Sequence, residues 1–408
     1  MKKETKKLWN RNFFLLWQGQ LVSAFGDALY AIALNLFVLE LTDSTGVMGS
    51  IMALVTVPRI ILGPFLGVVV DRSDRKKLIV IGDLIRGLSI LFVTGALWLG
   101  ILEVWLLMVV AVLDGICSAF FNPAIESSIP DLVPEENLVQ ANSVYQMAVT
   151  GADILGQSLG GAAYSLIGAP IMFLINGISY LFSAGTEIFL NIPKAISEKS
   201  KVTFCEDFKE GIHFVLRHEG MIRVIMMSFF INFLFGIIRV LIIPWFVESP
   251  HLGMGRYGVL SAIQSIGVLT GMTILSIITI KAHQKYRYYK ASLFLFIFMV
   301  GAAVLYNQYW GILVLFFLAF GFQMVFIMNS TVMQRTPVDK RGKVSSMKTT
   351  LCMAISPVGN FVGGLLGEVW NPRTIMLISV LLSVVVVSSI VIHPTVKDFL
   401  NYDSSQQE

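Results

Sequence analysis

The stretch "GVVVDRSDRKK", residues 67–77, is a short basic segment between two long apolar runs. The run before it covers residues 47–70, and the run after it covers residues 78–99. Each run has the roughly 20 residues that an α-helix needs to cross a bilayer. The segment therefore predicts a turn between two membrane spans, with its arginines and lysines on the cytoplasmic side.

The composition of the whole chain agrees with a membrane protein. Of 408 residues, 55% are hydrophobic and 14% are charged, and the mean hydropathy is +0.75. Soluble domains carry about 25% charged residues. The net charge of +4 is small and no basic face alternates with aromatic residues, so nucleic-acid binding is not expected. The three cysteines cannot form a disulfide framework and are interpreted as small core residues.

Apolar segments predict an all-α polytopic membrane protein with twelve transmembrane helices. The longest polar interval divides them into an N-terminal bundle (1–191), a cytoplasmic linker (192–220) and a C-terminal bundle (221–408). The predicted spans are 13–40, 47–70, 78–99, 104–124, 141–167, 171–191, 221–247, 257–280, 291–306, 310–330, 346–368 and 374–392.

Positive charge predicts the orientation of these spans. Lysine and arginine gather in the N-terminal tail, in alternate loops and in the central linker, whereas the opposite loops offer little beyond Arg256 and Arg373. Both termini and the linker should therefore be cytoplasmic in the plasma membrane. The first apolar run continues to about Leu39 without a cleavage site, so it is interpreted as a retained span. The acidic segment "ESSIPDLVPEEN" (126–137) is interpreted as a loop.

Two segments separated by 203 residues suggest an internal repeat. Residues 134–161 and 337–364 each begin with proline and share the pattern G-x-x-x-G-G, and each enters the fifth span of its half. Duplicated six-span halves are the parallel repeats of one transporter architecture. The alternative is that these glycines only let helices approach closely. They are Gly156, Gly160 and Gly161 in the first segment and Gly359, Gly363 and Gly364 in the second.

The basic segment resembles the loop signature of the major facilitator superfamily. The matching residues are Gly67, Asp71, Arg72, Arg75 and Lys76, while Asp74 stands where glycine is usual. Span count, linker and repeat extend the resemblance over the chain, which implies the twelve-helix fold of that family. Residues 120–144 further resemble drug:proton antiporters, the branch with macrolide efflux pumps and siderophore exporters. "GQSLGG" (156–161) is similar to an antiporter motif, except that Gln157 replaces its proline.

The charges of this segment suit a gate between two conformations. Asp71 and Arg75 are interpreted as a latch that pairs with a neighbouring bundle in one state only. Lys76 and Lys77 are interpreted mainly as topology signals.

Charged residues within the spans are the main candidates for a binding site, because charge is costly at a helix centre and usually faces a cavity or a partner. The sequence suggests three acids, Asp27, Asp114 and Asp153, against two bases, Arg59 and Arg239. If these groups pair, one carboxylate remains and could carry a proton, since burial disfavours the charged form. The alternative is that all five are structural pairs.

Helical spacing adds polar neighbours to these charges. Gln20, Asp27 and Tyr30 share one face of span one, and Asn232 and Arg239 lie on span seven. The resemblance implies that spans one, four, seven and ten line a central cavity. Asp27 is therefore predicted to face Arg239 across that cavity.

These features predict a secondary transporter, not an enzyme. No nucleotide-binding loop and no H-E-x-x-H motif occurs, and no cofactor or metal is expected. The favoured function is proton-coupled export of amphipathic or drug-like molecules by a monomer in the lipid bilayer. One alternative is a lysophospholipid transporter, because residues 23–34 and 235–245 are similar to that bacterial family. Another is a receptor or scaffold that does not transport.

The predicted topology can be tested by cysteine labelling. Cysteines introduced at Ser44 and at Pro372 should react with an impermeant reagent added outside intact cells. Cysteines introduced at Ser73 and at Asp339 should not, because they lie in the basic loops. Labelling of position 73 from outside would overturn the orientation.

Overall fold

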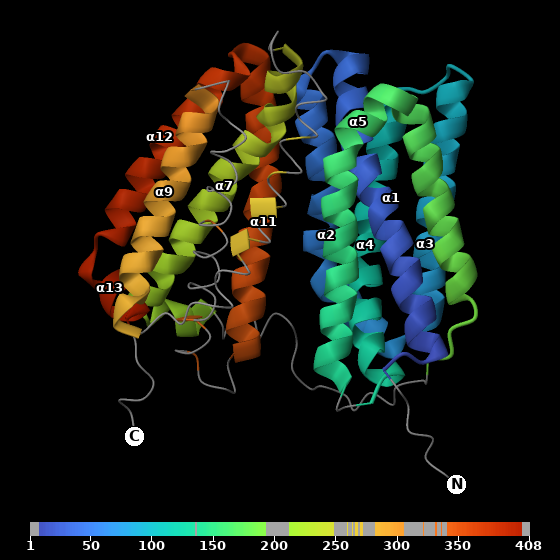
Figure 1. Ribbon diagram of the computed structural model, residues 1–408, viewed down its shortest axis with the longest axis horizontal. Coiled ribbons are helices and arrows are strands. Elements are labelled where there is room, and N and C mark those ends of the chain that lie inside the picture. The colour runs from blue at the N-terminus through green and yellow to red at the C-terminus, as the bar shows by residue number, and fades with distance from the viewer. Residues whose placement is uncertain are drawn as a thin grey trace. The chain divides into compact units, whose positions relative to one another are not determined.

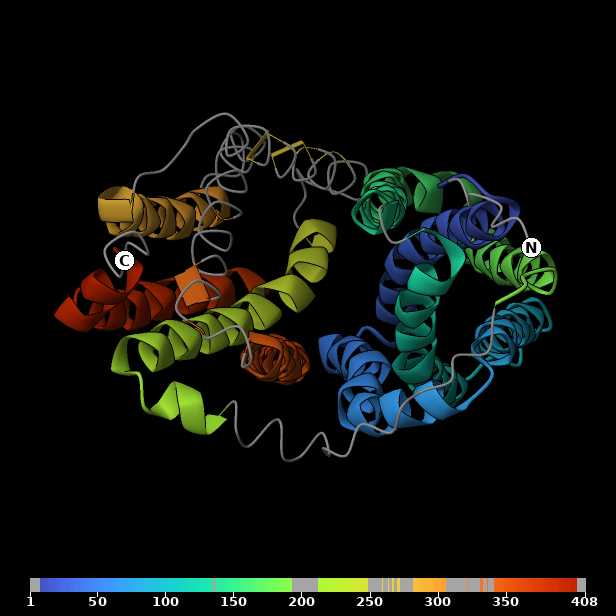
Figure 2. The same ribbon diagram turned by 90° about the horizontal axis from the view of Figure 1, so that it is seen from below.

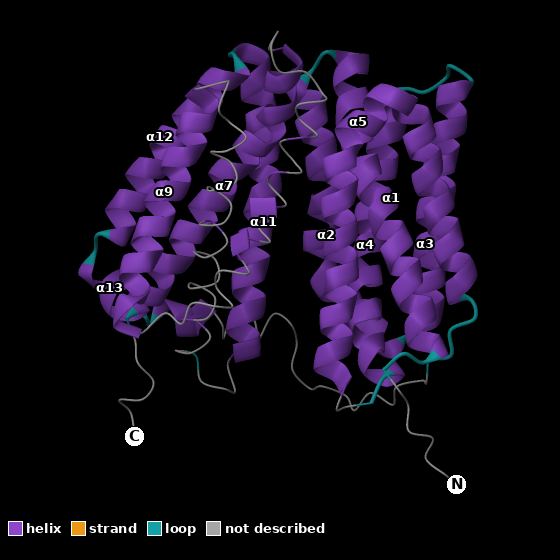
Figure 3. Ribbon diagram, viewed as in Figure 1, coloured by secondary structure: helices purple, strands orange, loops and turns teal. Residues whose placement is uncertain are grey.

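The computed structural model describes residues 8–134, 137–192, 212–248, 282–305 and 341–401, with a few separate residues between 259 and 336. The elements in these ranges are helices (Figure 3). Most residues of the predicted spans 257–280 and 310–330, and most of the predicted linker, fall outside the described residues. The number of twelve spans therefore stays a prediction.

The described chain divides into two compact units. The first comprises Met1–Asp43 and Ile51–Lys201, and the second comprises Ser44–Ser50 and Val202–Glu408 (Figure 1). The helices up to the linker are α1 (Arg11–Thr42), α2 (Thr45–Arg72), α3 (Arg75–Trp98), α4 (Val104–Leu132) and α5 (Leu138–Glu187). Those after it are α7 (Glu219–Glu248), η2 (Ala282–Gln284), α9 (Lys285–Leu305), α11 (Arg341–Val369), α12 (Pro372–Val391) and α13 (Pro394–Leu400).

Seven of the described helices are long and apolar enough to cross a membrane, judged by length and composition. One of them, α5, covers both the fifth and the sixth predicted spans. Its backbone is not helical at Gly168, where φ is 71° and ψ is 170°. Essentially only glycine adopts that conformation, and Pro170 follows two residues later. Helix α5 is therefore interrupted between the two predicted spans.

Capping residues explain two helix starts. The side chain of Asn10 accepts hydrogen bonds from the backbone N–H groups of Asn12 (3.1 Å) and Phe13 (3.0 Å), and so begins α1. Asp74 accepts a hydrogen bond from Lys77 N (3.3 Å) and begins α3. Aspartate is a favoured N-cap residue, which gives a physical reason for aspartate at the position where the family signature has glycine.

The acidic segment predicted as a loop is mostly helical. Helix α4 continues through Pro123 and Pro130 to Leu132, eight residues beyond the predicted end of its span. Asp131, in its last turn, forms an ion pair with Arg75 at the start of α3. That pair stabilises the end of the helix where hydropathy alone predicts a loop.

In the first unit, α1 packs closely along α5 (Figure 2). A Cβ atom at Gly156 would lie against Ala28 Cβ and 3.1 Å from the carbonyl oxygen of Phe25. A Cβ atom at Gly160 would lie 2.6 Å from Ile32 Cδ1. Gly161 is buried on the same helix. Glycine is therefore required where the α1 and α5 backbones approach each other.

The second unit repeats this arrangement with α7 and α11. A Cβ atom at Gly359 would collide with the carbonyl oxygen of Phe233 and lie 3.1 Å from Gly236 Cα. A Cβ atom at Gly363 would lie 2.8 Å from Ile237 Cα, and Gly364 meets the Ser44–Ser50 segment of the same unit. The two explanations of the glycine pattern are therefore compatible, because close approach recurs at corresponding positions of the two units.

The glycine contacts predict a specific loss of stability. Gly156→Ala should lower the free energy of unfolding by about 1–3 kcal/mol, because the added methyl group overpacks the contact with α1. Ala28→Gly in the same chain should recover part of the loss, since it removes the nearest atom. The measurement is thermal unfolding of the purified protein.

Gly151→Ala is the matched control, because nothing lies within 4 Å of a Cβ atom at that position of α5. It should unfold at or slightly above the midpoint of the unmodified protein. Equal destabilisation by both substitutions would contradict the close-contact explanation.

Candidate functional site

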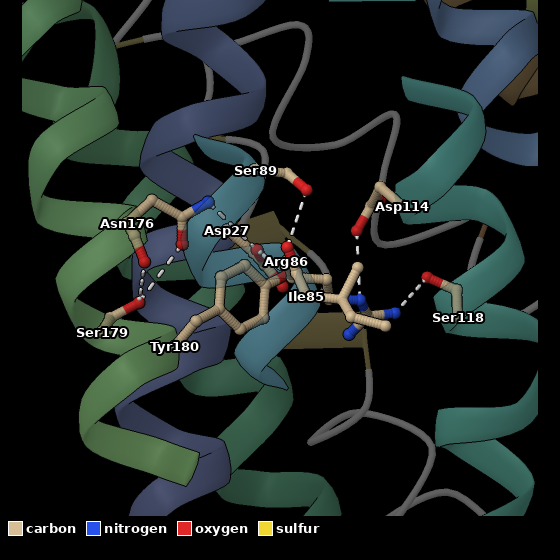
Figure 4. Close-up of polar contacts among 9 residues, drawn as sticks. All are labelled: Asp27, Ile85, Arg86, Ser89, Asp114, Ser118, Asn176, Ser179 and Tyr180. Carbon is tan, nitrogen blue, oxygen red and sulfur yellow. Dashed lines mark hydrogen bonds and ion pairs between the residues drawn. The ribbon is translucent and has the colours of Figure 1, made fainter. Parts of the chain in front are cut away.

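Asp27 is held by two side chains from the second part of α5 (Figure 4). The Tyr180 hydroxyl donates to Asp27 Oδ1 at 2.5 Å, and Asn176 Nδ2 donates to the same oxygen at 3.3 Å. Ser179 donates to Asn176 Oδ1 at 3.2 Å and orients that amide. The carboxyl group of Asp27 is thus a fixed acceptor on the first helix, and Asp27 is only partly buried.

Arg86, on α3, is the buried positive charge beside this acceptor. Its Nε lies 3.1 Å from Asp114 Oδ1 on α4, and its guanidinium donates to the Ser118 hydroxyl. The same guanidinium lies 4.6 Å from the ring centre of Phe121 and 5.5 Å from that of Tyr180. Rings at such distances attract a cation. Arg86 is 5% exposed in its side chain, whereas Asp114 is 27% exposed.

Arg86 therefore interacts with more than one acidic side chain. Arg86 attracts Asp27 and Asp83 as well as Asp114, and Asp27 and Asp114 repel each other. With the arginine charged, the group formed by Asp27, Asp114 and Arg86 has one carboxyl group in excess. This Arg86 cluster can lose its excess negative charge by binding a proton or a positively charged group.

The predicted site residues of the first unit do not all lie together. Asp27 and Asp114 lie in the Arg86 cluster, and Tyr30 interacts electrostatically with both acids. Gln20 lies elsewhere, donating to Glu187 Oε1 at 3.0 Å. Arg59 and Asp153 are exposed, and Asp153 accepts a hydrogen bond from Gln157 on its own helix at 2.8 Å.

The predicted residues on span seven belong to the second unit. Arg239 is exposed on α7, and Asn232 donates to the carbonyl oxygen of Ser228 at 2.8 Å. The predicted contact between Asp27 and Arg239 therefore stays a prediction. In the first unit, the positive partner of Asp114 is Arg86 on α3.

Of the predicted gating residues, Arg75 has a defined contact. It donates to Asp131 Oδ2 at 2.5 Å and to the carbonyl oxygen of Ser127 at 2.8 Å, both on α4 of its own unit. The latch was expected to pair with a neighbouring bundle, so this contact differs from the prediction. Lys76 is partly buried, whereas the side chains of Asp71 and Arg72, and the surroundings of Gly67, fall outside the described part.

The count of three acids against two bases missed charged residues on the third and sixth spans. Asp83 and Arg86 lie within the predicted span 78–99, and Glu187 lies within 171–191. All three are buried. The spacing of Asp83 and Arg86 by three residues places them on one helix face, and that signal could have identified the third span as part of the site.

Comparison with known proteins supports transport. The family description "Major Facilitator Superfamily" matches residues 16–358. Macrolide efflux protein A of Streptococcus pyogenes is 26% identical over 271 residues, which are 65% of this chain and 67% of that protein. Putative bacilysin exporter BacE of Bacillus subtilis is 29% identical over 259 residues, which are 62% of each chain.

Solved structures agree at the level of the fold. A bacterial homologue of the human lysosomal transporter Spinster, in an inward-facing and unoccupied conformation, superposes with a TM-score of 0.72 at 15% identity. The match covers 99% of this chain and 100% of that one. The likeness supports an all-helical transporter fold.

The shared arginine predicts a strong effect of its removal. Arg86→Gln should lower the free energy of unfolding by about 3–5 kcal/mol, because it leaves the buried Asp83 and the partly buried Asp27 and Asp114 without their positive partner. Adding Asp114→Asn should recover part of that loss. Chemical unfolding of the purified protein measures both.

The control is Arg223→Gln, which removes an exposed ion pair with Glu219 on α7. Such an exposed pair contributes little to stability, because water and salt screen its attraction. If the Arg86 and Arg223 variants lost similar stability, the Arg86 cluster would not be the buried centre described above.

Proposed function

The chain belongs to the major facilitator superfamily, and we propose that it exports amphipathic, drug-like molecules in exchange for protons. As a member of that family it is a multi-span membrane transporter. The proposal adds the direction, the driving ion and the substrate class. It places both termini and the linker in the cytoplasm, as the basic loops predict.

The relatives support export of bulky natural products. One relative is named for macrolide efflux and another for bacilysin export. Their identity to this chain is 26% and 29%, so the substrate class is carried over as a proposal. Aromatic side chains and methionines suit adaptable contacts with varied amphipathic molecules.

The observation that carries the proposal is the excess carboxyl group of the Arg86 cluster. Asp27 and Asp114 both depend on Arg86, so one negative charge is not neutralised within the three residues. A proton on Asp27 would neutralise it. A substrate with a charged amine would do the same, so proton and substrate would compete for one site.

Competition of this kind provides coupling. A site that binds either a proton or a substrate, and that changes conformation only when occupied, exchanges one for the other across the membrane. Tyr180 and Asn176 would fix Asp27 for this role, and Tyr30 and Asp114 would complete the site. Gln20, Arg59, Asp153, Asn232 and Arg239 are kept as further candidates, with Asp71, Arg72, Arg75 and Lys76 as a conformational latch.

The proposal predicts that Asp27→Asn abolishes transport driven by a pH gradient while the protein still folds. The amide can keep the hydrogen bond with Tyr180 but cannot exchange a proton. The measurement is pH-driven accumulation of a macrolide in liposomes that contain the purified protein.

Asp43→Asn is the matched control, because Asp43 is an exposed residue just after the same helix and asparagine also tolerates its left-handed backbone. It should transport normally. Normal pH-driven transport by a folded Asp27→Asn variant would show that Asp27 is not the proton site. Transport of lysophosphatidylcholine in place of a macrolide would favour the lysophospholipid alternative.

A further inference from the structure

A second polar group lies inside the first unit, apart from the Arg86 cluster. Asp83 on α3 and Ser183 and Glu187 on α5 are each 0% exposed. Among the described residues, Asp83 Oδ1 and Oδ2, Ser183 Oγ and Glu187 Oε2 have no hydrogen-bond partner of normal geometry. The three side chains nevertheless adjoin, because Asp83 and Glu187 interact with each other and both interact with Ser183.

Helix α1 closes this group from one side. Gln20 donates to Glu187 Oε1 at 3.0 Å, which fixes the glutamate. A Cβ atom at Gly19 would lie 2.8 Å from Ser183 Oγ and 3.3 Å from Glu187 Oε1, so the absence of a side chain lets the helix backbone cover them. Helices α1 and α5 therefore lie in close contact at this position.

This group has fewer hydrogen-bond donors than acceptor oxygen atoms. The four oxygen atoms without partners share one hydrogen, that of the Ser183 hydroxyl. A buried acceptor without a donor is costly, and two carboxylates in one dry site do not both ionise. One added proton, on either carboxyl group, would supply a second hydrogen-bond donor beside the Ser183 hydroxyl.

The charges around the pair favour a proton over a metal cation. In the described part of the chain, Arg86 acts on Asp83 as a positive charge, and the Asp27 carboxyl group opposes it. Tyr145 of α5 interacts electrostatically with both acids, and Cys117 of α4 interacts with Asp83. An arginine beside Asp83 repels a metal ion, whereas a proton becomes part of a neutral carboxyl group.

We propose that Asp83 and Glu187 together bind one proton and form an inner proton-binding site, separate from Asp27. Binding forms one O–H bond and release breaks it. The site also lies along the polar face of α5 that holds Asp27, because Tyr180, Ser183 and Glu187 follow one another at helical spacing. The exchange of this proton during transport rests on the proposed function, whereas its presence does not.

Infrared spectroscopy of the purified protein at neutral pH tests the proton without any substrate. The C=O band of a protonated carboxyl group should be present in the unmodified protein. The double variant Asp83→Asn with Glu187→Gln should lose that part of the band. Glu103→Gln, at an exposed glutamate just before α4, is the matched control and should leave the band intact.

An unchanged band in the double variant would overturn the proposal. Loss of the band from the unmodified protein on addition of sodium would also overturn it, in favour of a metal-cation site. If the double variant does not fold, Glu187→Gln alone serves, because a proton that remains on the pair must then lie on Asp83, and only the pair's part of the band is compared. The band should disappear or change frequency, and an unchanged band would contradict a shared proton.

Transport then separates the two proposals. The double variant should lose at least tenfold in pH-driven macrolide accumulation while it retains downhill transport. Accumulation equal to that of the unmodified protein would show that the inner proton takes no part in coupling. If the unmodified protein ignores the pH gradient, the proposed function fails, and the infrared result still decides whether the pair holds a proton.

Discussion

The polar interior of the first unit depends on the electrostatic interactions of Arg86 with the surrounding acids and aromatic rings. Arg86 joins α3 to α4 through Asp114 and lies beneath the ring of Tyr180 on α5. Tyr180 in turn holds Asp27 on α1. Side chains from three other helices therefore surround one guanidinium. Without it, a carboxylate could not remain charged at low cost. Because more than one acid uses the same arginine, the interior keeps a carboxyl group that can change its protonation.

Close helix contact makes this arrangement possible. Gly156 and Gly160 bring α5 against α1 in the first unit, and Gly359 and Gly363 bring α11 against α7 in the second. Asp27 meets Asn176 where α1 contacts the second part of α5, and the glycine at that contact is Gly26, where a Cβ atom would lie 2.6 Å from Asn176 Oδ1. The two units share the glycine contact but differ in charge. Asp27 is partly buried beside the shared arginine, whereas Arg239 on α7 is exposed.

The sequence predicted most helix positions because hydropathy and span length are strong signals in a membrane chain. Asp27 and Asp114 are visible in the sequence as acids within apolar spans, and in the structure each contacts a side chain on another helix. The partners themselves are not predictable from spacing along one helix, since Tyr180 and Arg86 lie on other helices than the acids that they contact. The extension of α4 to Leu132 was missed because hydropathy does not register the pair between Arg75 and Asp131. Asp83, Arg86 and Glu187 are single charges in otherwise apolar spans, and hydropathy alone does not identify them as parts of one polar interior.

The central claim is that proton and substrate compete for the excess carboxyl group of the Arg86 cluster. Calorimetric titration of the purified protein with a macrolide, repeated in buffers that differ in ionisation enthalpy, measures this most directly. The binding heat should change with the buffer because substrate binding releases a proton. The Asp27→Asn variant should bind with a heat that no longer depends on the buffer. A heat independent of the buffer in the unmodified protein, with binding intact, would contradict the account.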